Sequence, residues 1–127
     1  MLQPTTELDR LLLVGDDPAS SDAIATHLRR HGFLVVGQVR SAEAARTAAR
    51  YTDPDVVLVD AAVHDGWRAV VAALTGVMDQ AHIAVLASYW SSDERRAANA
   101  TGIGGVFLKS VEGDSLAGRL RAIAAHS

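Results

Sequence analysis

Short apolar runs alternate along the chain with alanine-rich stretches, and this alternation constrains the fold more than any other feature of the sequence. Each run is about five residues long and is bounded by polar residues or glycine, as buried strands are. The stretches between them carry apolar residues at helical spacing. The five runs are Arg10–Val14, Phe33–Gly37, Val56–Asp60, Ile83–Ala87 and Gly105–Lys109. Strands that alternate with helices predict a parallel sheet that helices cover on both faces.

The predicted helices carry start signals, end signals and apolar faces. Asp17 precedes Pro18, a pair that is typical of an N-cap followed by proline at the first helical position. Ser41 is a candidate cap for the next helix, and Gly32, Gly66 and Gly102 mark ends. The apolar faces consist of Ile24, Leu28 and His31 in the first helix and of Leu116, Leu120 and Ile123 in the last. We therefore expect a doubly wound, three-layer α/β domain with five strands and five helices over residues 10–127, after a loose tail over residues 1–9.

Composition and charge exclude several classes of function. The chain has 127 residues, of which 49% are hydrophobic and 21% charged, as expected for one globular domain. Its net charge of −3 and its scattered arginines argue against a nucleic-acid interface. It has no cysteine, which is compatible with a reducing cytoplasm, and no apolar run long enough to span a membrane. The N-terminus lacks signal-peptide character. We expect a cytoplasmic protein.

Polar residues follow four of the predicted strands. They are Asp16 and Asp17 after the first strand, Asp60 at the end of the third, Ser88 after the fourth and Lys109 at the end of the fifth. Ligands of open parallel sheets bind outside the carboxyl ends of the strands, so these side chains would meet at one edge. Taken singly, four of these residues have an ordinary explanation: a helix cap at Asp17, a turn at Asp60, a strand-end serine at Ser88 and a solvated lysine at Lys109.

Taken together, these residues have the chemistry of a phosphoryl site. Converging carboxylates repel one another unless a cation neutralises them, and oxygen ligands alone favour Mg²⁺. Asp16, Asp17 and Asp60 are the candidate metal ligands, and Asp60 is the candidate nucleophile. Lys109, the only lysine beside eleven arginines, would contact one phosphoryl oxygen and Ser88 another.

The sequence resembles the receiver domain of two-component response regulators over residues 10–126. The segments that carry the resemblance are LLLVGDDPASSDAIATHLRRHGF, PDVVLVD, HDGW and TGIGGVFLKS. The resemblance implies a flavodoxin-like fold with strand order 2-1-3-4-5 and Mg²⁺-dependent transfer of phosphate from a histidine kinase to Asp60. Asp16 and Asp17 would be its acidic pair and Lys109 its phosphate-contacting lysine. Such a domain is not an enzyme beyond catalysing its own phosphorylation and dephosphorylation. Its phosphorylation alters partner binding.

Several positions depart from the family pattern. The loop after Asp60 is two residues shorter than usual and lacks the customary proline. Counting back from Lys109 puts Ala87 at the position of the switch hydroxyl, whereas counting forward from the Asp65-Gly66 pair puts Ser88 there. Val106 stands where switching receivers carry an aromatic residue, with Phe107 beside it. Ser110 follows the lysine in place of the more usual proline.

Two hypotheses follow. In the first, the chain is a phosphoacceptor switch that signals through the face formed by the fourth helix, the fifth strand and the last helix. In the second, it is a pseudo-receiver that keeps the fold as a protein-interaction module. The acids and Lys109 favour the first, and Ala87, Val106 and the short loop favour the second. A nucleotide-binding α/β enzyme is a third reading, but the turn GDDPAS lacks a glycine-rich phosphate loop.

Other candidates have simpler explanations. His27 and His31 are four residues apart on a helix, yet no third zinc ligand is identifiable near them. His64 follows Asp60 closely enough to affect metal access or dephosphorylation, although it also fits a solvated loop. Trp90, with Tyr89, is either a partner-binding anchor or a cover for the edge of the sheet, and we favour the cover. The GIGG segment at residues 102–105 is explained by turn chemistry.

The expected partners follow from the resemblance alone. They are a sensor histidine kinase or phosphotransfer protein and a second copy of the chain, bound through the face named above. We expect neither direct nucleic-acid binding nor a membrane contact. These residues contain no output domain, so the chain is either a stand-alone receiver or part of a larger regulator.

Overall fold

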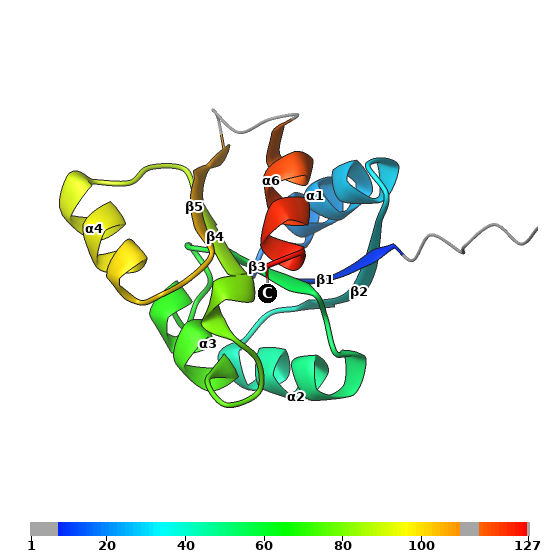
Figure 1. Cartoon of the computed structure of the whole chain (residues 1–127), viewed down its shortest axis with the longest axis horizontal. Helices are drawn as coiled ribbons and strands as arrows, with labels where there is room; N and C mark the ends of the chain where they lie inside the picture. Colours follow the sequence, from blue (N-terminus) through cyan, green and yellow to red (C-terminus); the bar gives the residue numbers. More distant parts are fainter. Residues whose placement is uncertain (1–7, 110–114, 127) are drawn as a thin grey trace, which may run out of the picture.

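The chain folds into an open sheet of five parallel strands flanked by helices. The structure is a computed structural model, and it describes residues 8–109 and 115–126. The strands are β1 (Asp9–Val14), β2 (Phe33–Val39), β3 (Val56–Asp60), β4 (Ile83–Ala87) and β5 (Gly105–Leu108). The α-helices within this part are α1 (Pro18–Arg30), α2 (Ala42–Thr52), α3 (Trp67–Leu74), α4 (Ser92–Ala100) and α6 (Leu116–Ala124), and a short 3₁₀ helix, η1 (Gln80–His82), precedes β4 (Figure 1). The strand order is β2-β1-β3-β4-β5, which confirms the predicted fold class and topology.

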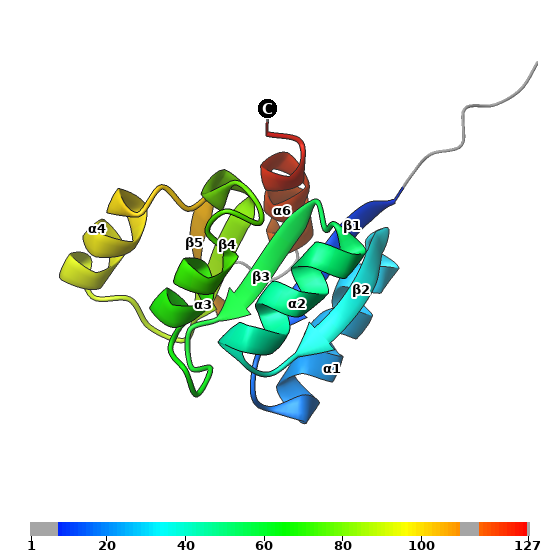
Figure 2. The same cartoon turned by 90° about the horizontal axis from the view of Figure 1, so that it is seen from below.

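The sheet is buried on both faces, as its continuous apolar strands predict. Leu11 and Leu13 of β1 pack in the cluster that contains residues of α1 and α6. Leu12 and Val14 pack in the opposite cluster, with residues of α2, α3 and α4. Figure 2 shows α1 and α6 on one side of the sheet and α2 and α3 on the other. Because successive side chains of a strand point to opposite faces, each short run contributes to both cores.

Strand boundaries differ from the prediction by one or two residues. β1 begins at Asp9 and so includes the last residue of the predicted N-terminal tail; residues 1–7 of that tail lie outside the described residues. β2 continues past Gly37 to Val39. Gly37 lies beside a shift of register between Leu11 and Leu12, and a Cβ atom there would stand 3.1 Å from the Leu12 Cδ1 atom. It is therefore a packing glycine inside the strand and not the end of it.

The predicted helix signals are largely confirmed. Asp17 caps α1 with Pro18 in its first turn, and the Ser41 hydroxyl accepts a hydrogen bond from the Ala44 amide at 3.1 Å. His31, which we expected on the apolar face of α1, is instead an exposed C-cap. The prediction for His31 is wrong because α1 ends at Arg30, so the helical periodicity does not extend to His31.

The glycines of the GIGG segment have two physical roles. Gly102 adopts a φ of +83° after α4, which confirms the predicted turn. Gly104 packs so tightly that a Cβ atom would press on the Ala81 carbonyl oxygen, a contact that turn chemistry alone does not explain.

Among the described helices, none is long and apolar enough to cross a membrane.

Candidate functional site

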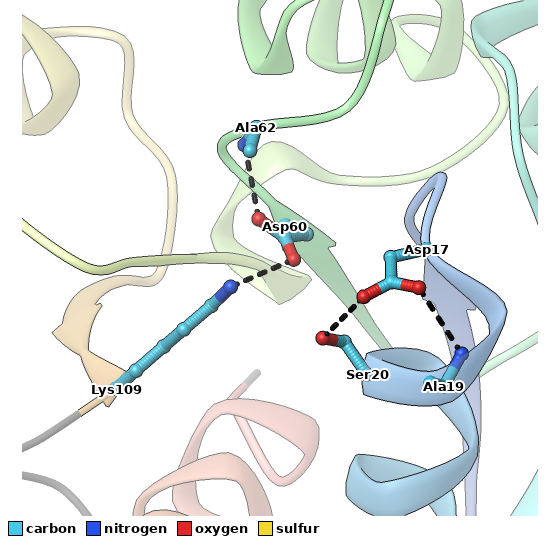
Figure 3. A network of polar contacts seen from close by, with 6 residues as sticks. All are labelled: Asp17, Ala19, Ser20, Asp60, Ala62 and Lys109. Carbon is cyan, nitrogen blue, oxygen red and sulfur yellow. Dashed lines mark hydrogen bonds and ion pairs between the residues drawn. The ribbon is translucent and has the colours of Figure 1, made fainter.

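Asp60 and Lys109 meet at the carboxyl edge of the sheet. Asp60 is the last residue of β3, and Lys109 directly follows β5. The Lys109 Nζ atom lies 2.9 Å from Asp60 Oδ2, and the other carboxylate oxygen accepts a hydrogen bond from the Ala62 amide at 2.9 Å (Figure 3). The Asp60 side chain is only 13% exposed, so its charge depends on these donors more than on water. The structure thus unites the predicted nucleophile with the predicted lysine.

Asp17 points its carboxylate at the start of α1 instead of at Asp60. One of its oxygens accepts from the Ala19 amide at 3.3 Å and the other from the Ser20 hydroxyl at 2.9 Å (Figure 3). Asp16, between β1 and this cap, is half-buried. In the described residues, no three His, Cys, Asp or Glu side chains lie close enough together to hold a metal ion.

The predicted triad of metal ligands is therefore not assembled in this structure. Both oxygens of the Asp17 carboxylate accept hydrogen bonds from the first turn of α1, and these bonds hold the carboxylate as a helix cap. The donors that remain, Asp16 and Asp60, are hard carboxylate oxygens, which suit Mg²⁺ and leave most of its coordination to water.

Gly15 lies against Asp60, and the sequence analysis did not single it out. A Cβ atom on Gly15 would stand 3.3 Å from the Asp60 Cβ atom and 3.2 Å from the hydroxyl oxygen of Ser21, the only buried polar side chain among the described residues. Any larger residue would press on the candidate phosphoacceptor. The only available signal was a glycine between an apolar run and two acids, which a simple turn produces equally well.

The end of β4 carries no hydroxyl. Ala87 is the last residue of the strand, is buried, and lies in register with Leu108, the residue before Lys109. Ser88 follows the strand and is exposed. The register pairs Ala87 with Leu108, so Ser88 and Lys109 each lie one residue beyond the paired ends of β4 and β5. Val106 of β5, two residues before Leu108, is half-buried against the core that contains Ala87.

Trp90 covers the edge of the sheet, as we favoured. Its indole is 8% exposed, and its Nε1 atom donates to the Phe107 carbonyl of the edge strand β5 at 2.9 Å. Its ring meets that of Trp67 edge to face, with centroids 6.1 Å apart. Tyr89, in contrast, is exposed. The tryptophan thus fastens the β4–α4 connection to β5.

The histidines do not join the candidate site. His64 is exposed in the loop after Asp60. The rings of His27 and His31 lie 4.4 Å apart, but in the described part of the chain no third ligand completes a metal cluster with them.

The geometry and topology define an open, flavodoxin-like α/β domain with a charged site at the carboxyl ends of its strands. No family model and no curated protein matches the sequence. Solved structures do match it. The BeF₃-activated N-terminal receiver domain of Klebsiella pneumoniae RstA is 26% identical, with a TM-score of 0.80, and the match covers 93% of this chain and 100% of that one. A LuxR-family two-component response regulator from Aurantimonas sp. is 25% identical, with a TM-score of 0.81, over 94% of this chain and 86% of that one.

A third match brings a metal into the comparison. It is the receiver domain of the Pseudomonas aeruginosa sensor histidine kinase PA1611, a structure with a magnesium ion coordinated in its active-site cleft. It is 19% identical, with a TM-score of 0.79, over 94% of this chain and 100% of that one, and this likeness shows the fold. The comparisons confirm the resemblance predicted from the sequence: the chain has the fold of the receiver domains of two-component response regulators and is similar to them over nearly its whole length.

Proposed function

We propose that the chain is a phosphoacceptor receiver, phosphorylated on Asp60 in a Mg²⁺-dependent reaction. The observation that carries this proposal is the 2.9 Å contact between Lys109 and a mostly buried Asp60 carboxylate. Fold and function agree here, because the edge formed by the carboxyl ends of the strands is where doubly wound sheets bind ligands. The domain would catalyse its own phosphorylation and dephosphorylation and no other reaction.

The residues at this edge have separate tasks. An Asp60 carboxylate oxygen forms a bond to phosphorus while the bond from phosphorus to the donor breaks, which yields an acyl phosphate. The leaving atom is an imidazole nitrogen when the donor is a phosphohistidine and a carboxyl oxygen when it is acetyl phosphate. Lys109 is close enough to pair with a phosphoryl oxygen in place of the carboxylate. The Ala62 amide, already bonded to Asp60, is a second donor beside the same group. Bound Mg²⁺, held by Asp16 and Asp60 with Asp17 if it leaves its cap, would neutralise phosphoryl charge.

A pseudo-receiver is the second candidate, and one specific observation favours it. The end of β4 is Ala87, so the strand between Asp60 and Lys109 offers no side-chain hydroxyl to a phosphoryl oxygen. Under this alternative the Asp60–Lys109 pair is a structural ion pair, and the fold serves as a phosphorylation-independent docking module.

The proposed partners are a sensor histidine kinase or phosphotransfer protein and, through the α4–β5–α6 face, a second copy of the chain. Receiver domains interact with histidine kinases, which supports the first partner. We place the protein in the cytoplasm on the same grounds, because the kinases of such systems phosphorylate their receivers there.

Intact-mass spectrometry after incubation with acetyl phosphate and Mg²⁺ tests the proposal. One phosphoryl adduct on the wild type, and none on Asp60→Asn, is the expected result. Asp79→Asn is the matched control, because the Asp79 carboxylate also accepts a backbone amide two residues further on, but Asp79 is an exposed residue in the turn before η1. A folded wild type without any adduct would favour the pseudo-receiver.

A further inference from the structure

We infer that Asp65 is a positioning residue for Asp60, because it ties the loop after the phosphoacceptor to the N-terminus of α2. This inference rests on the proposed function and adds to it a residue from outside the charged edge. The loop runs from Ala61 to Gly66, between β3 and α3. Asp65 lies near its far end and does not contact Asp60 in any bond that the structure records.

The contact that carries the inference joins segments far apart in the sequence. Asp65 Oδ2 accepts a hydrogen bond from the Ala42 amide, the first of α2, at 2.8 Å. The Ser41 hydroxyl accepts from the Ala44 amide of the same helix. The first turn of α2 therefore has two side-chain acceptors, one of its own and one from the loop. A carboxylate is favoured at this end, because the helix dipole and the free amides attract negative charge.

The same loop holds the amide that contacts Asp60. Its first turn is fixed at Val63, whose amide donates to the Asp60 carbonyl at 3.0 Å and whose side chain is buried in the core. The Gly66 amide donates back to the Val63 carbonyl at 2.8 Å. Ala62, exposed, precedes Val63, and only its amide bond to the Asp60 carboxylate is recorded for it. Val63 and Asp65 thus anchor the loop on the side that follows Ala62, one in the core and one on α2.

The loop is short, so the two anchors have a direct consequence for the chemistry. With Asp65 released, the segment would keep Val63 and the bond from the Ala61 amide to the Leu86 carbonyl at 2.9 Å but would lose its tie to α2, and the Ala62 amide would turn away from Asp60 more often. Asp60 would then lose a donor that orients its carboxylate, and an incoming phosphoryl group would lose the same donor. Asp65 acts through Ala62 and does not touch the reacting atoms.

A simpler role, in which Asp65 only caps α2, makes a different prediction, and Ser41 separates the two. Ser41→Ala removes the other cap of the same helix turn and leaves the loop intact. Asp65→Ala removes both the cap and the tie. Asp65→Asn keeps an acceptor oxygen that can bond the Ala42 amide, so it should restore the tie without the charge.

The experiment measures hydrogen exchange of the Ala62 amide by NMR in the wild type and the three variants. We expect Asp65→Ala to speed this exchange about fivefold, the factor that corresponds to the typical loss of one N-cap bond. Ser41→Ala and Asp65→Asn should leave it within about twofold of the wild type. Equal acceleration in Asp65→Ala and Ser41→Ala would overturn the inference, because the effect would then come from α2 alone.

Phosphorylation by acetyl phosphate is then timed in the same four proteins. Asp65→Ala should be labelled more slowly, while Asp65→Asn and Ser41→Ala should match the wild type. Labelling of Asp65→Ala at the wild-type rate would also overturn the inference. A wild type that takes up no phosphate would refute the proposed function instead, and the exchange measurement alone would then decide whether Asp65 holds the loop.

Discussion

The bond between the Trp90 indole and the Phe107 carbonyl should contribute measurably to the stability of the fold. Both residues are buried, and the Nε1–O distance is 2.9 Å. Trp90→Phe keeps an aromatic ring but removes the donor, which leaves a buried carbonyl without that partner at a cost of about 1–3 kcal/mol. The smaller ring also loses packing and part of the contact with Trp67. The total cost therefore exceeds that of the hydrogen bond.

Trp67→Phe is the matched control for this prediction. Trp67 is as buried as Trp90 and is the other member of the same edge-to-face pair, so both variants lose a similar ring area and leave one Phe–Trp pair. No hydrogen bond from the Trp67 indole is recorded in the part of the chain that the structure describes. The Arg68 guanidinium lies 5.2 Å from the Trp67 ring centroid, and phenylalanine keeps a ring at that position. The difference between the two variants therefore reports mainly the bond to Phe107, which we put at about 1.5 kcal/mol.

Urea denaturation at 25 °C measures the difference. With a slope of about 2 kcal/mol per molar, the midpoint of Trp90→Phe should fall about 0.7 M below that of Trp67→Phe. Each variant retains one of the two tryptophans of the chain, so fluorescence follows both transitions. Equal midpoints would refute the reasoning, because they would mean that the indole bond contributes no net stability.

Three further predictions concern the helix cap, the glycine contact and the metal. Asp17→Ala should lower the free energy of unfolding by about 1 kcal/mol, and Asp17→Asn should not, because asparagine caps equally well; denaturation midpoints check this. Gly104→Ala should cost about 1–3 kcal/mol, since its Cβ would press on the Ala81 carbonyl, and a melting temperature equal to the wild type's would contradict it. Mg²⁺ at about tenfold its Kd should stabilise the wild type by about 1.4 kcal/mol in thermal melts. Asp16→Asn should abolish that gain and Asp17→Asn should keep it; the reverse pattern would make Asp17 the ligand.

The fold was predictable because its signals are local and repeated. Each strand is an apolar run whose residues face two cores, and the Asp17-Pro18 and Ser41 caps mark helix starts through bonds that span only two or three residues. The meeting of Asp60 and Lys109 was predictable for a related reason, because a parallel sheet brings the carboxyl ends of its strands to one edge. Both predictions can be made without knowing which residues far apart in the sequence are in contact.

The remaining features of the site depend on contacts that leave no local pattern. The Asp17 carboxylate suits both a cap and a metal; its bonds to Ala19 and Ser20 establish the cap, and its part in a metal site stays a prediction. The tie from Asp65 to Ala42 spans 23 residues, and the sequence contains no signal that pairs them. Gly15 was missed because close packing against Asp60 requires the absence of a side chain, which reads like any turn glycine.

The strand β5 links the Asp60–Lys109 ion pair to the bond between Trp90 and Phe107, and the two hypotheses assign different roles to this link. Lys109 at its end neutralises Asp60, while the Phe107 carbonyl, two residues earlier, receives the Trp90 indole. Ala87, at the end of β4, has no hydroxyl that could bond Asp60. Among the described bonds, Lys109 is therefore the one side chain that links Asp60 to the β4–β5 side of the domain. A phosphoryl group that displaced the ammonium would act on β5 beside the bond that fastens the β4–α4 connection. In a pseudo-receiver the same ion pair would simply lock β5 to β3, so the role of Lys109, as a moving contact or a fixed one, is the physical difference between a switch and a docking module.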